Sequence, residues 1–158
     1  KRSPFEDGLR TPILFRWTNR ITPARHDLLC SSVDIVSTLL YLTGQASSAE
    51  PLPGINLLDA TARKAHTNRT VQGAIYPGDA STLGNPARDV AYRWIRQGQY
   101  KLIVPHGKAP WGNYLKFPSL FNLKLDPSEQ TNLIHEPAHK PIVQSLKQQL
   151  DAWWNPNH

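Results

Sequence analysis

Apolar residues recur along the chain at two kinds of spacing, and each spacing predicts a different element. Over residues 33–43 the apolar side chains lie three and four positions apart, which predicts a helix with a wide apolar side. We expect that side to pack against a sheet. Gly44 follows this helix and is suited to end it in a left-handed conformation. The same helical spacing predicts a second helix over residues 138–154.

Shorter apolar runs predict strands. These runs lie at residues 70–76, 90–96, 100–104 and 120–125. Gln97-Gly98-Gln99 joins two of them by a tight connection, which predicts an antiparallel hairpin. The apolar residues 13–15 predict a further short buried strand, and turn residues such as Asp7-Gly8 predict that a loop precedes it.

Together the elements predict an α/β chain, more closely an α+β fragment, in two parts. Residues 1–62 supply a strand and a helix. Residues 63–158 form a small antiparallel sheet packed against the C-terminal helix, which covers one of its faces. We place the boundary near Ala62, because residues 59–69 are polar and basic.

The composition limits the possible partners. Lys and Arg exceed Asp and Glu by 18 to 12, which gives a net charge of +6 and favours anionic partners. The alternative is an ordinary solvated surface, because the basic residues form no long run. We expect no nucleic-acid partner, since no basic helix and no aromatic ribonucleoprotein motif occurs. We also expect no membrane partner, since no run approaches the ~20 apolar residues of a span.

Two further counts bear on what kind of chain this is. The 158 residues contain no methionine, so we expect a fragment of a longer protein. The single cysteine excludes an internal disulfide.

Two stretches carry side chains with possible chemistry. Near the start of the chain, Lys1, Glu6 and Arg10 surround a glycine before an apolar run, an arrangement that can hold an anion. The alternative is that these charges are only solvated. The imidazole groups of His66, His135, His139 and His158 show no spacing typical of metal ligands.

The second stretch is the loop of residues 106–114, which follows a predicted strand. It combines an imidazole, an ammonium and two aromatic rings with flexible glycines, so it can contact a sugar or an aryl group. The candidate substrate-binding residues are His106, Lys108, Trp111 and Tyr114. The alternative is a hairpin tip whose aromatic rings pack on the sheet.

Five segments share their polar and glycine positions with motifs that occur together in one enzyme family. Residues 1–12 resemble K-x-x-x-Y-E-G-G-x-R-x-P, with Phe5 and Asp7 in place of Tyr and Gly. Residues 31–40 resemble S-x-x-D-[IL]-x-P-T-L-L, with Ser37 where Pro is common. Residues 53–58 resemble D-G-x-S-L-L in their glycine and leucines, residues 93–103 match R-x-x-x-x-G-x-Y-K-L-I, and residues 120–133 resemble L-[YF]-D-L-x-x-D-P-x-E-x-x-N-L, with Asn122 in place of Asp. The matches keep the family's order, and the chain resembles the C-terminal part of a sulfatase.

The resemblance implies hydrolysis of sulfate esters by the full-length protein. Sulfatases carry a Cys or Ser in C-x-P-x-R that is oxidised to formylglycine, the nucleophile. Cys30 is not followed by Pro and Arg at these places, and Ile21, which precedes Pro23 and Arg25, cannot become an aldehyde. We therefore interpret residues 1–62 as the end of the catalytic domain and residues 63–158 as the C-terminal subdomain. The fragment alone is expected to be inactive.

Roles for individual residues follow from the same resemblance. Lys1 stands at the place of a catalytic lysine, where its ammonium stabilises negative charge on the sulfate group. Glu6 and Arg10 are expected to support this loop. We expect no cofactor in this fragment and calcium in the full-length enzyme, since the family's cluster of Asp ligands is missing here.

The expected partners are a sulfated small molecule or glycan and the N-terminal part of the same polypeptide. A periplasmic or secreted location is expected by family resemblance. Two alternatives remain open. One is a phosphate or phosphonate ester hydrolase of the same alkaline-phosphatase-like superfamily, and the other is a non-catalytic module that binds anionic glycans.

Overall fold

The computed structural model describes residues 3–46, 52–59, 64, 68–77, 85–107 and 111–156. The chain forms two compact units, which we call the sheet unit (residues 1–11 and 72–158) and the helix unit (residues 12–71). The predicted division at residue 62 concerns the parts of a larger fold, and it stays a prediction. In the described part, no helix is both long and apolar enough to cross a membrane.

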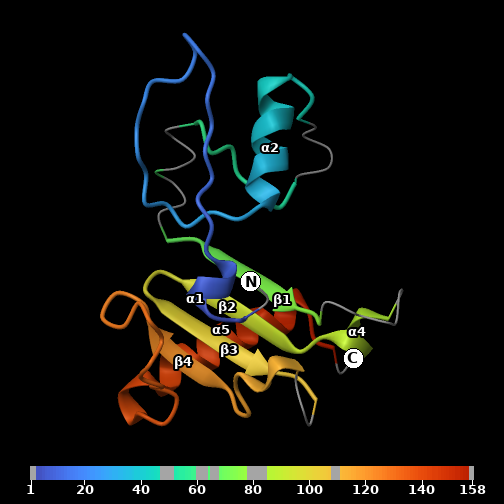
Figure 1. Ribbon diagram of the computed structural model, residues 1–158, viewed down its shortest axis with the longest axis vertical. Coiled ribbons are helices and arrows are strands. Elements are labelled where there is room, and N and C mark those ends of the chain that lie inside the picture. Colours follow the sequence, from blue (N-terminus) through green and yellow to red (C-terminus); the bar gives the residue numbers. More distant parts are fainter. Residues whose placement is uncertain are drawn as a thin grey trace. The chain divides into compact units, whose positions relative to one another are not determined.

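The sheet has the strand order β1-β2-β3-β4 (Figure 1). Its strands are β1 (Thr70–Ile75), β2 (Tyr92–Gln97), β3 (Tyr100–Pro105) and β4 (Ser119–Asn122). β2 and β4 both pair with β3 in antiparallel fashion. Gly98 adopts a positive φ of 56° in the tight connection between β2 and β3, so the predicted hairpin is confirmed.

Helical segments flank the strands. The sheet unit contains α1 (Glu6–Leu9), α4 (Pro86–Asp89), the short 3₁₀ helices η1 (Trp111–Asn113) and η2 (Pro137–His139), and α5 (Lys140–Trp153). The predicted C-terminal helix is confirmed as η2 followed by α5. The loop predicted before residue 13 is in part wrong, because Phe5 to Arg10 close a helical turn by backbone hydrogen bonds.

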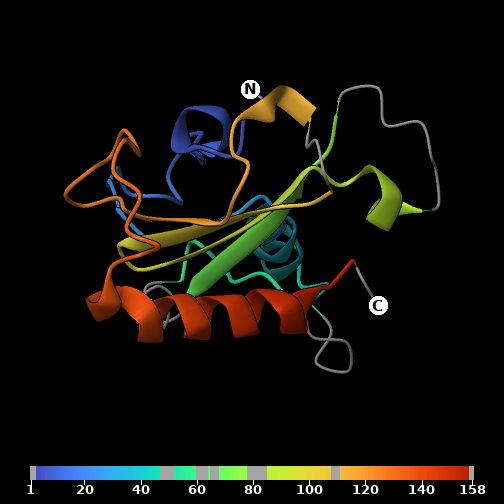
Figure 2. The same ribbon diagram turned by 90° about the horizontal axis from the view of Figure 1, so that it is seen from below.

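The sheet is covered on both faces, whereas the sequence predicted a cover on one (Figure 2). The long helix α5 lies along one face, and α1 with η1 lies over the other. Residues of β2 and β3 alternate between the two sides, as the strand period requires. The core under α5 consists of Ile95, Leu102, Leu120, Leu146 and Leu150. The core under α1 consists of Ile75, Ala91, Tyr92, Ile103 and Phe121, with Phe5 and Leu9 packed against it.

A buried arginine joins the end of α5 to the sheet. The guanidinium of Arg93 donates hydrogen bonds to Asp151 Oδ1 (3.0 Å) and to the carbonyl oxygen of Trp154 (2.5 Å). Partial burial raises the pKa of Asp151, but hydrogen bonds from Lys147 and Arg93 lower that pKa more, to below its ordinary value. The charged carboxylate therefore adds stability above pH 3.8, its ordinary pKa, and this stability is lost as the pH falls through the folded-state pKa.

The helix unit buries its polar residues. In α2 (Val33–Leu42) the buried side chains are Asp34, Ser37 and Thr38. Asp34 Oδ1 accepts a hydrogen bond from the Ile55 backbone N–H (2.9 Å). Asp34 Oδ2 accepts one from Arg69 (2.9 Å) and one from the backbone N–H of Ser31 (2.7 Å). Asp34 therefore gathers three separate segments around the N-terminal end of α2.

Gly54 permits a close approach in the same unit. A Cβ at this position would lie 2.4 Å from Ser37 Oγ and 2.5 Å from the Val33 carbonyl oxygen. The chain after Gly54 then runs past α2, where Thr38 Oγ1 accepts the Leu57 backbone N–H at 2.9 Å. Gly54 is the glycine of the segment that resembles D-G-x-S-L-L, and the contact distance gives the physical reason for a glycine at this position.

Two predictions about the helix unit are wrong. The apolar side of α2 is exposed rather than packed against a sheet, with Leu39 50% and Val36 54% exposed. Residues 13–15 form no strand, and Leu14 is 88% exposed. A strand needs a hydrogen-bonded neighbour, and the described residues offer none to this segment. The helix itself and the left-handed Gly44 (φ 69°) are confirmed.

We predict that Asp151→Asn lowers the free energy of unfolding of the full-length protein by about 1.5–3 kcal/mol at pH 7, the range for hydrogen bonds to charged groups. The deficit should shrink below pH 3.8, where Asp151 itself becomes protonated. Chemical denaturation at several pH values measures this difference. Asp27→Asn is the control, because its pair with Arg25 is exposed and its loss should have no measurable effect. A deficit independent of pH would contradict the assignment.

Candidate functional site

The segment that contains Lys1 is held in a compact turn from its third residue onward. Lys1 itself lies outside the described residues. The buried Ser3 donates from Oγ to Asp7 Oδ1 (2.7 Å). A Cβ on Gly8 would lie 2.5 Å from the Ser3 carbonyl oxygen, so only glycine allows the turn to close this tightly. The Asp-Gly pair therefore folds α1 back onto Ser3.

A charged cluster fixes α1 on the sheet. We call Glu6, Arg96, Lys101 and Glu129 the Lys101 cluster. The Lys101 ammonium lies 3.0 Å from Glu6 Oε1 and 2.9 Å from Glu129 Oε1. The Arg96 guanidinium lies 2.8 Å from Glu6 Oε2, and the Glu6 backbone N–H donates to Glu129 Oε2 at 2.5 Å. Each of the four carboxylate oxygens therefore has one cationic or N–H partner.

The centre of this cluster is shielded from water. The side chain of Lys101 is 0% exposed and that of Glu129 is 2% exposed. The ring of Trp94 lies 5.9 Å from the ammonium of Lys101. Burial raises the pKa of Glu129, and the hydrogen bonds from the Glu6 amide and Lys101 oppose this rise only in part. The cluster is thus a buried network of three ion pairs, in which the carboxylates of Glu6 and Glu129 both depend on the ammonium of Lys101.

The turn after β4 places the side chain of Glu129 next to Lys101 and Glu6. Asp126 Oδ2 accepts the Thr131 backbone N–H at 2.7 Å, and the Asp126 carbonyl oxygen accepts the Glu129 N–H at 3.2 Å. Glu129 itself adopts a positive φ of 54°, which is unusual for a residue other than glycine. The segment from Asp126 to Glu129 is thus an ordered support for the cluster.

Arg96, Lys101 and Glu129 lie within motifs of the sulfatase resemblance, but the sequence alone predicts no role for them. A signal was present for Lys101. It is the only charged residue in the apolar strand β3 and points to the same face as Ile103. A lysine at such a position requires an acidic partner.

Two of the predicted loop residues, Trp111 and Tyr114, lie on the same face of the sheet as α1. The ring centroids of Trp111 and Tyr114 are 6.1 Å apart, and Tyr114 lies 6.3 Å from Phe5. The backbone N–H of Tyr114 donates to the hydroxyl of Tyr92 (2.9 Å). Tyr114 retains 39% of its surface exposed. The rings thus pack beside the N-terminal segment, and their contact with substrate stays a prediction.

The other predicted residues are placed as follows. His106 is half-buried, and its backbone N–H donates to the Ala91 carbonyl oxygen (2.8 Å). Arg10 is exposed, and its N–H donates to the Glu6 carbonyl oxygen (2.8 Å). Lys108 lies outside the described residues. The structure therefore brings Glu6, Trp111 and Tyr114 to one face of the sheet and leaves the positions of Lys1 and Lys108 undescribed.

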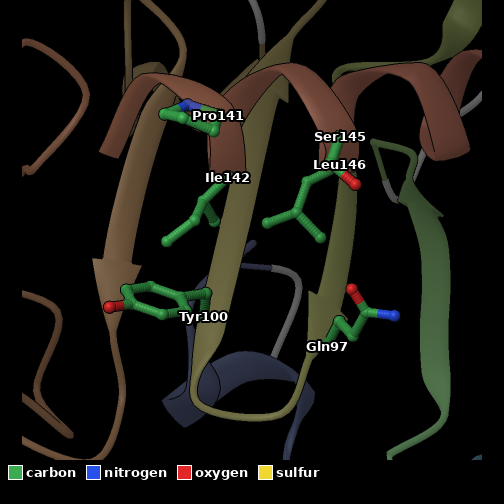
Figure 3. A pocket seen from close by; sticks show the side chains of 6 residues that line it. All are labelled: Gln97, Tyr100, Pro141, Ile142, Ser145 and Leu146. Carbon is green, nitrogen blue, oxygen red and sulfur yellow. The ribbon is translucent and has the colours of Figure 1, made fainter. Parts of the chain in front are cut away.

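A hollow of about 310 Å³ lies on the opposite face, between the β2–β3 hairpin and α5 (Figure 3). It is lined by Gln97, Tyr100, Pro141, Ile142, Ser145 and Leu146. None of these side chains is charged, so the lining offers no cation for a sulfate group. We assign the hollow no role in the chemistry.

Calcium does not fit the side chains that the structure describes. Over those residues, no three His, Cys, Asp or Glu side chains lie close enough together to hold a metal ion. The calcium implied by the family resemblance would need ligands from elsewhere in the full-length protein.

The fold and the motifs around α1 define the C-terminal domain of a sulfatase. The family model described as N-sulphoglucosamine sulphohydrolase, C-terminal, matches residues 1–155, and the chain belongs to this family.

Two curated relatives agree with this assignment. An N-acetylgalactosamine-6-O-sulfatase of Bacteroides thetaiotaomicron is 29% identical over 96% of this chain and 29% of its own length. An ulvan-active sulfatase of Formosa agariphila is 27% identical over 97% of this chain and 30% of its own length. The chain thus spans about a third of the length of these relatives.

Solved structures show the same fold. A 2-O GAG sulfatase matches with a TM-score of 0.51 and 24% identity over 76% of this chain and 23% of its own. A protein solved with its substrate D-glucosamine-2-N,6-O-disulfate matches with a TM-score of 0.53 and 19% identity, over 75% and 22%. The predicted small antiparallel sheet with a C-terminal helix is confirmed.

We predict that Lys101→Met lowers the free energy of unfolding by about 3–5 kcal/mol at pH 7, because it leaves two carboxylates without their buried cation. The deficit should shrink as the pH falls and the Glu129 carboxylate, whose pKa is raised by burial, becomes protonated. Denaturation of the full-length protein tests this. Lys147→Met is the matched control, because that lysine pairs with Asp151 on the exposed side of α5. Equal losses in the two variants would refute the central place of Lys101.

Proposed function

We propose that the full-length protein hydrolyses sulfate esters of a sugar, and that this chain supplies its C-terminal subdomain together with Lys1. The observation that carries the proposal is the family match over residues 1–155, which includes the segment of Lys1. The activities of the two curated relatives favour a sulfated glycan as the substrate class. The net charge of +6 also suits an anionic substrate.

The nucleophile of this reaction belongs to residues outside the chain. The one cysteine, Cys30, lacks the pattern that formylglycine formation needs. Burial raises the pKa of its thiol, as does the nearby Asp34, while Arg69 opposes the shift. A thiol held in its protonated form is a poor nucleophile. We therefore propose that the formylglycine is a residue of the N-terminal part of the same polypeptide. We also propose that this part binds the calcium ion.

Within this chain, the proposed chemical role falls to Lys1. An ammonium at the sulfate group stabilises the negative charge that gathers on its oxygens in the transition state. The described segment supports this role, because hydrogen bonds of Ser3 and α1 hold the chain in place from its third residue onward. Trp111 and Tyr114 are proposed to contact the sugar, since they share the face of α1. His106 and Lys108 belong to the same loop by sequence and are proposed to take part in this contact.

The N-terminal part of the polypeptide is also the proposed partner of the helix unit. The apolar side of α2 exposes Val33, Val36, Leu39 and Leu42. Exposed apolar side chains grouped on one side of a helix are typical of an interaction site. The chain covers only 29–30% of its curated relatives, so the full-length protein has residues available to cover α2.

A substrate panel tests the function. The full-length protein is expected to release inorganic sulfate from N-acetylgalactosamine 6-sulfate, glucosamine 2-N,6-O-disulfate or ulvan oligosaccharides. Peptide mass mapping should show formylglycine in place of a Cys or Ser. Release of phosphate from matched phosphate monoesters, with no release of sulfate, would instead favour the phosphatase alternative.

We predict that Lys1→Ala in the full-length protein lowers kcat on the best sulfated substrate by about 10²–10³-fold, the cost of removing one transition-state donor. The melting temperature should stay unchanged. Arg2→Ala is the matched control, since it removes a neighbouring cation without this role and should keep near-normal turnover. Full turnover by Lys1→Ala would refute the role of Lys1.

We further predict that Leu39→Asp in the full-length protein lowers the midpoint of thermal unfolding, because it places a charge in the covered apolar surface. Gln45→Asp adds the same charge just after α2 at an exposed polar residue and should have little effect. Differential scanning calorimetry compares the two variants. Equal midpoints would mean that nothing covers this side of α2.

A further inference from the structure

The Lys101 cluster holds Glu6 at two points. Glu129 accepts the backbone N–H of Glu6, and Lys101 binds both the Glu6 and the Glu129 carboxylates. These contacts form a closed ring that fixes the main chain of Glu6 as well as its side chain. The main chain at Glu6 therefore cannot shift without breaking a buried charged contact.

Both anchors of the ring stand on rigid elements. Lys101 lies in β3, opposite Arg96 of β2 and Phe121 of β4, so it is paired on both sides. Glu129 is set by the ordered turn that begins at Asp126. From Glu6 the fixed geometry continues to Ser3 through the Ser3–Asp7 hydrogen bond and the close packing of Gly8. Ser3 is two residues from Lys1.

We propose that Lys101 and Glu129 are positioning residues for the sulfatase reaction, because they fix α1 on the sheet and thereby set the place of Lys1. This inference rests on the proposed function. Neither residue contacts the substrate, since both are buried under α1. Their effect reaches the reaction through the backbone from Glu6 to Ser3.

A double-mutant cycle separates positioning from a general loss of structure. Lys101→Met is made in the full-length wild-type protein and in the Lys1→Ala variant, and kcat and KM are measured on the best substrate of the panel. If Lys101 acts through Lys1, the two losses are not additive. A general loss of structure lowers turnover by the same factor in both backgrounds.

The expected result is a fall in kcat of about 10- to 100-fold for Lys101→Met, the scale for a misplaced catalytic group. KM should change by less than about threefold, since substrate binding uses other contacts. In the Lys1→Ala background, Lys101→Met should change kcat by less than about twofold. Lys147→Met, the matched control on α5, should keep wild-type kcat. An equal fall in both backgrounds would overturn the inference.

Glu6→Gln is the second variant if Lys101→Met fails to fold, because it removes one charge and leaves the Lys101–Glu129 pair intact. The same cycle is then run with Glu6→Gln and the same outcomes are expected. Hydrogen exchange of the Leu9 and Arg10 amides, which close the turn of α1, reports on α1 without activity. These amides should exchange faster in either variant, and unchanged exchange would overturn the inference.

The two proposals fail in different ways. Full turnover by Lys1→Ala refutes the proposed function of Lys1. If Lys1→Ala is inactive while Lys101→Met loosens α1 and keeps wild-type kcat, the proposed function stands and the positioning role is overturned.

Discussion

The fold around the N-terminal segment depends on one buried ammonium group. Lys101 is surrounded by the carboxylates of Glu6 and Glu129, and no part of its side chain is exposed to solvent. An unpaired charge at this place would be very costly, so α1 must stay on the sheet for as long as the sheet is folded. The antiparallel pairing of β2 with β3 brings Arg96 and Lys101 together, and the turn after β4 adds Glu129. Segments far apart in the sequence thus converge on Glu6.

In α2 of the helix unit, the pattern of buried and exposed side chains is the opposite of that expected for an independent domain. The buried residues of α2 are polar, with Asp34 and Thr38 joined to the segment after Gly54, while apolar side chains such as Val36 and Leu39 are exposed. The polar contacts give the unit its internal structure. The exposed apolar side of α2 agrees with a chain that covers only about a third of its relatives' length.

Period and turn chemistry were enough to predict most of the regular elements. The apolar spacing located α2 and α5, and the glycine in Gln97-Gly98-Gln99 located the hairpin. The strand at residues 13–15 was wrong because a strand depends on a neighbour that the local sequence does not show. Helix α1 was not predicted because it is only four residues long and therefore has no periodic pattern. It is held in place by Glu129, which lies 123 positions from Glu6 in the sequence. The role of Lys101 was missed for the same reason, since its partners are distant in sequence. The family resemblance supplied Lys1, and local patterns alone would not have singled it out.

The most direct test of the whole account is a crystal structure of the full-length protein with a bound sulfated sugar. The account predicts that the Lys1 ammonium lies within about 3.2 Å of a sulfate oxygen. It also predicts that Lys101 contacts Glu6 and Glu129 in the same structure. A sulfate group bound far from Lys1, or an α1 that has left the sheet while the sugar is in place, would contradict it.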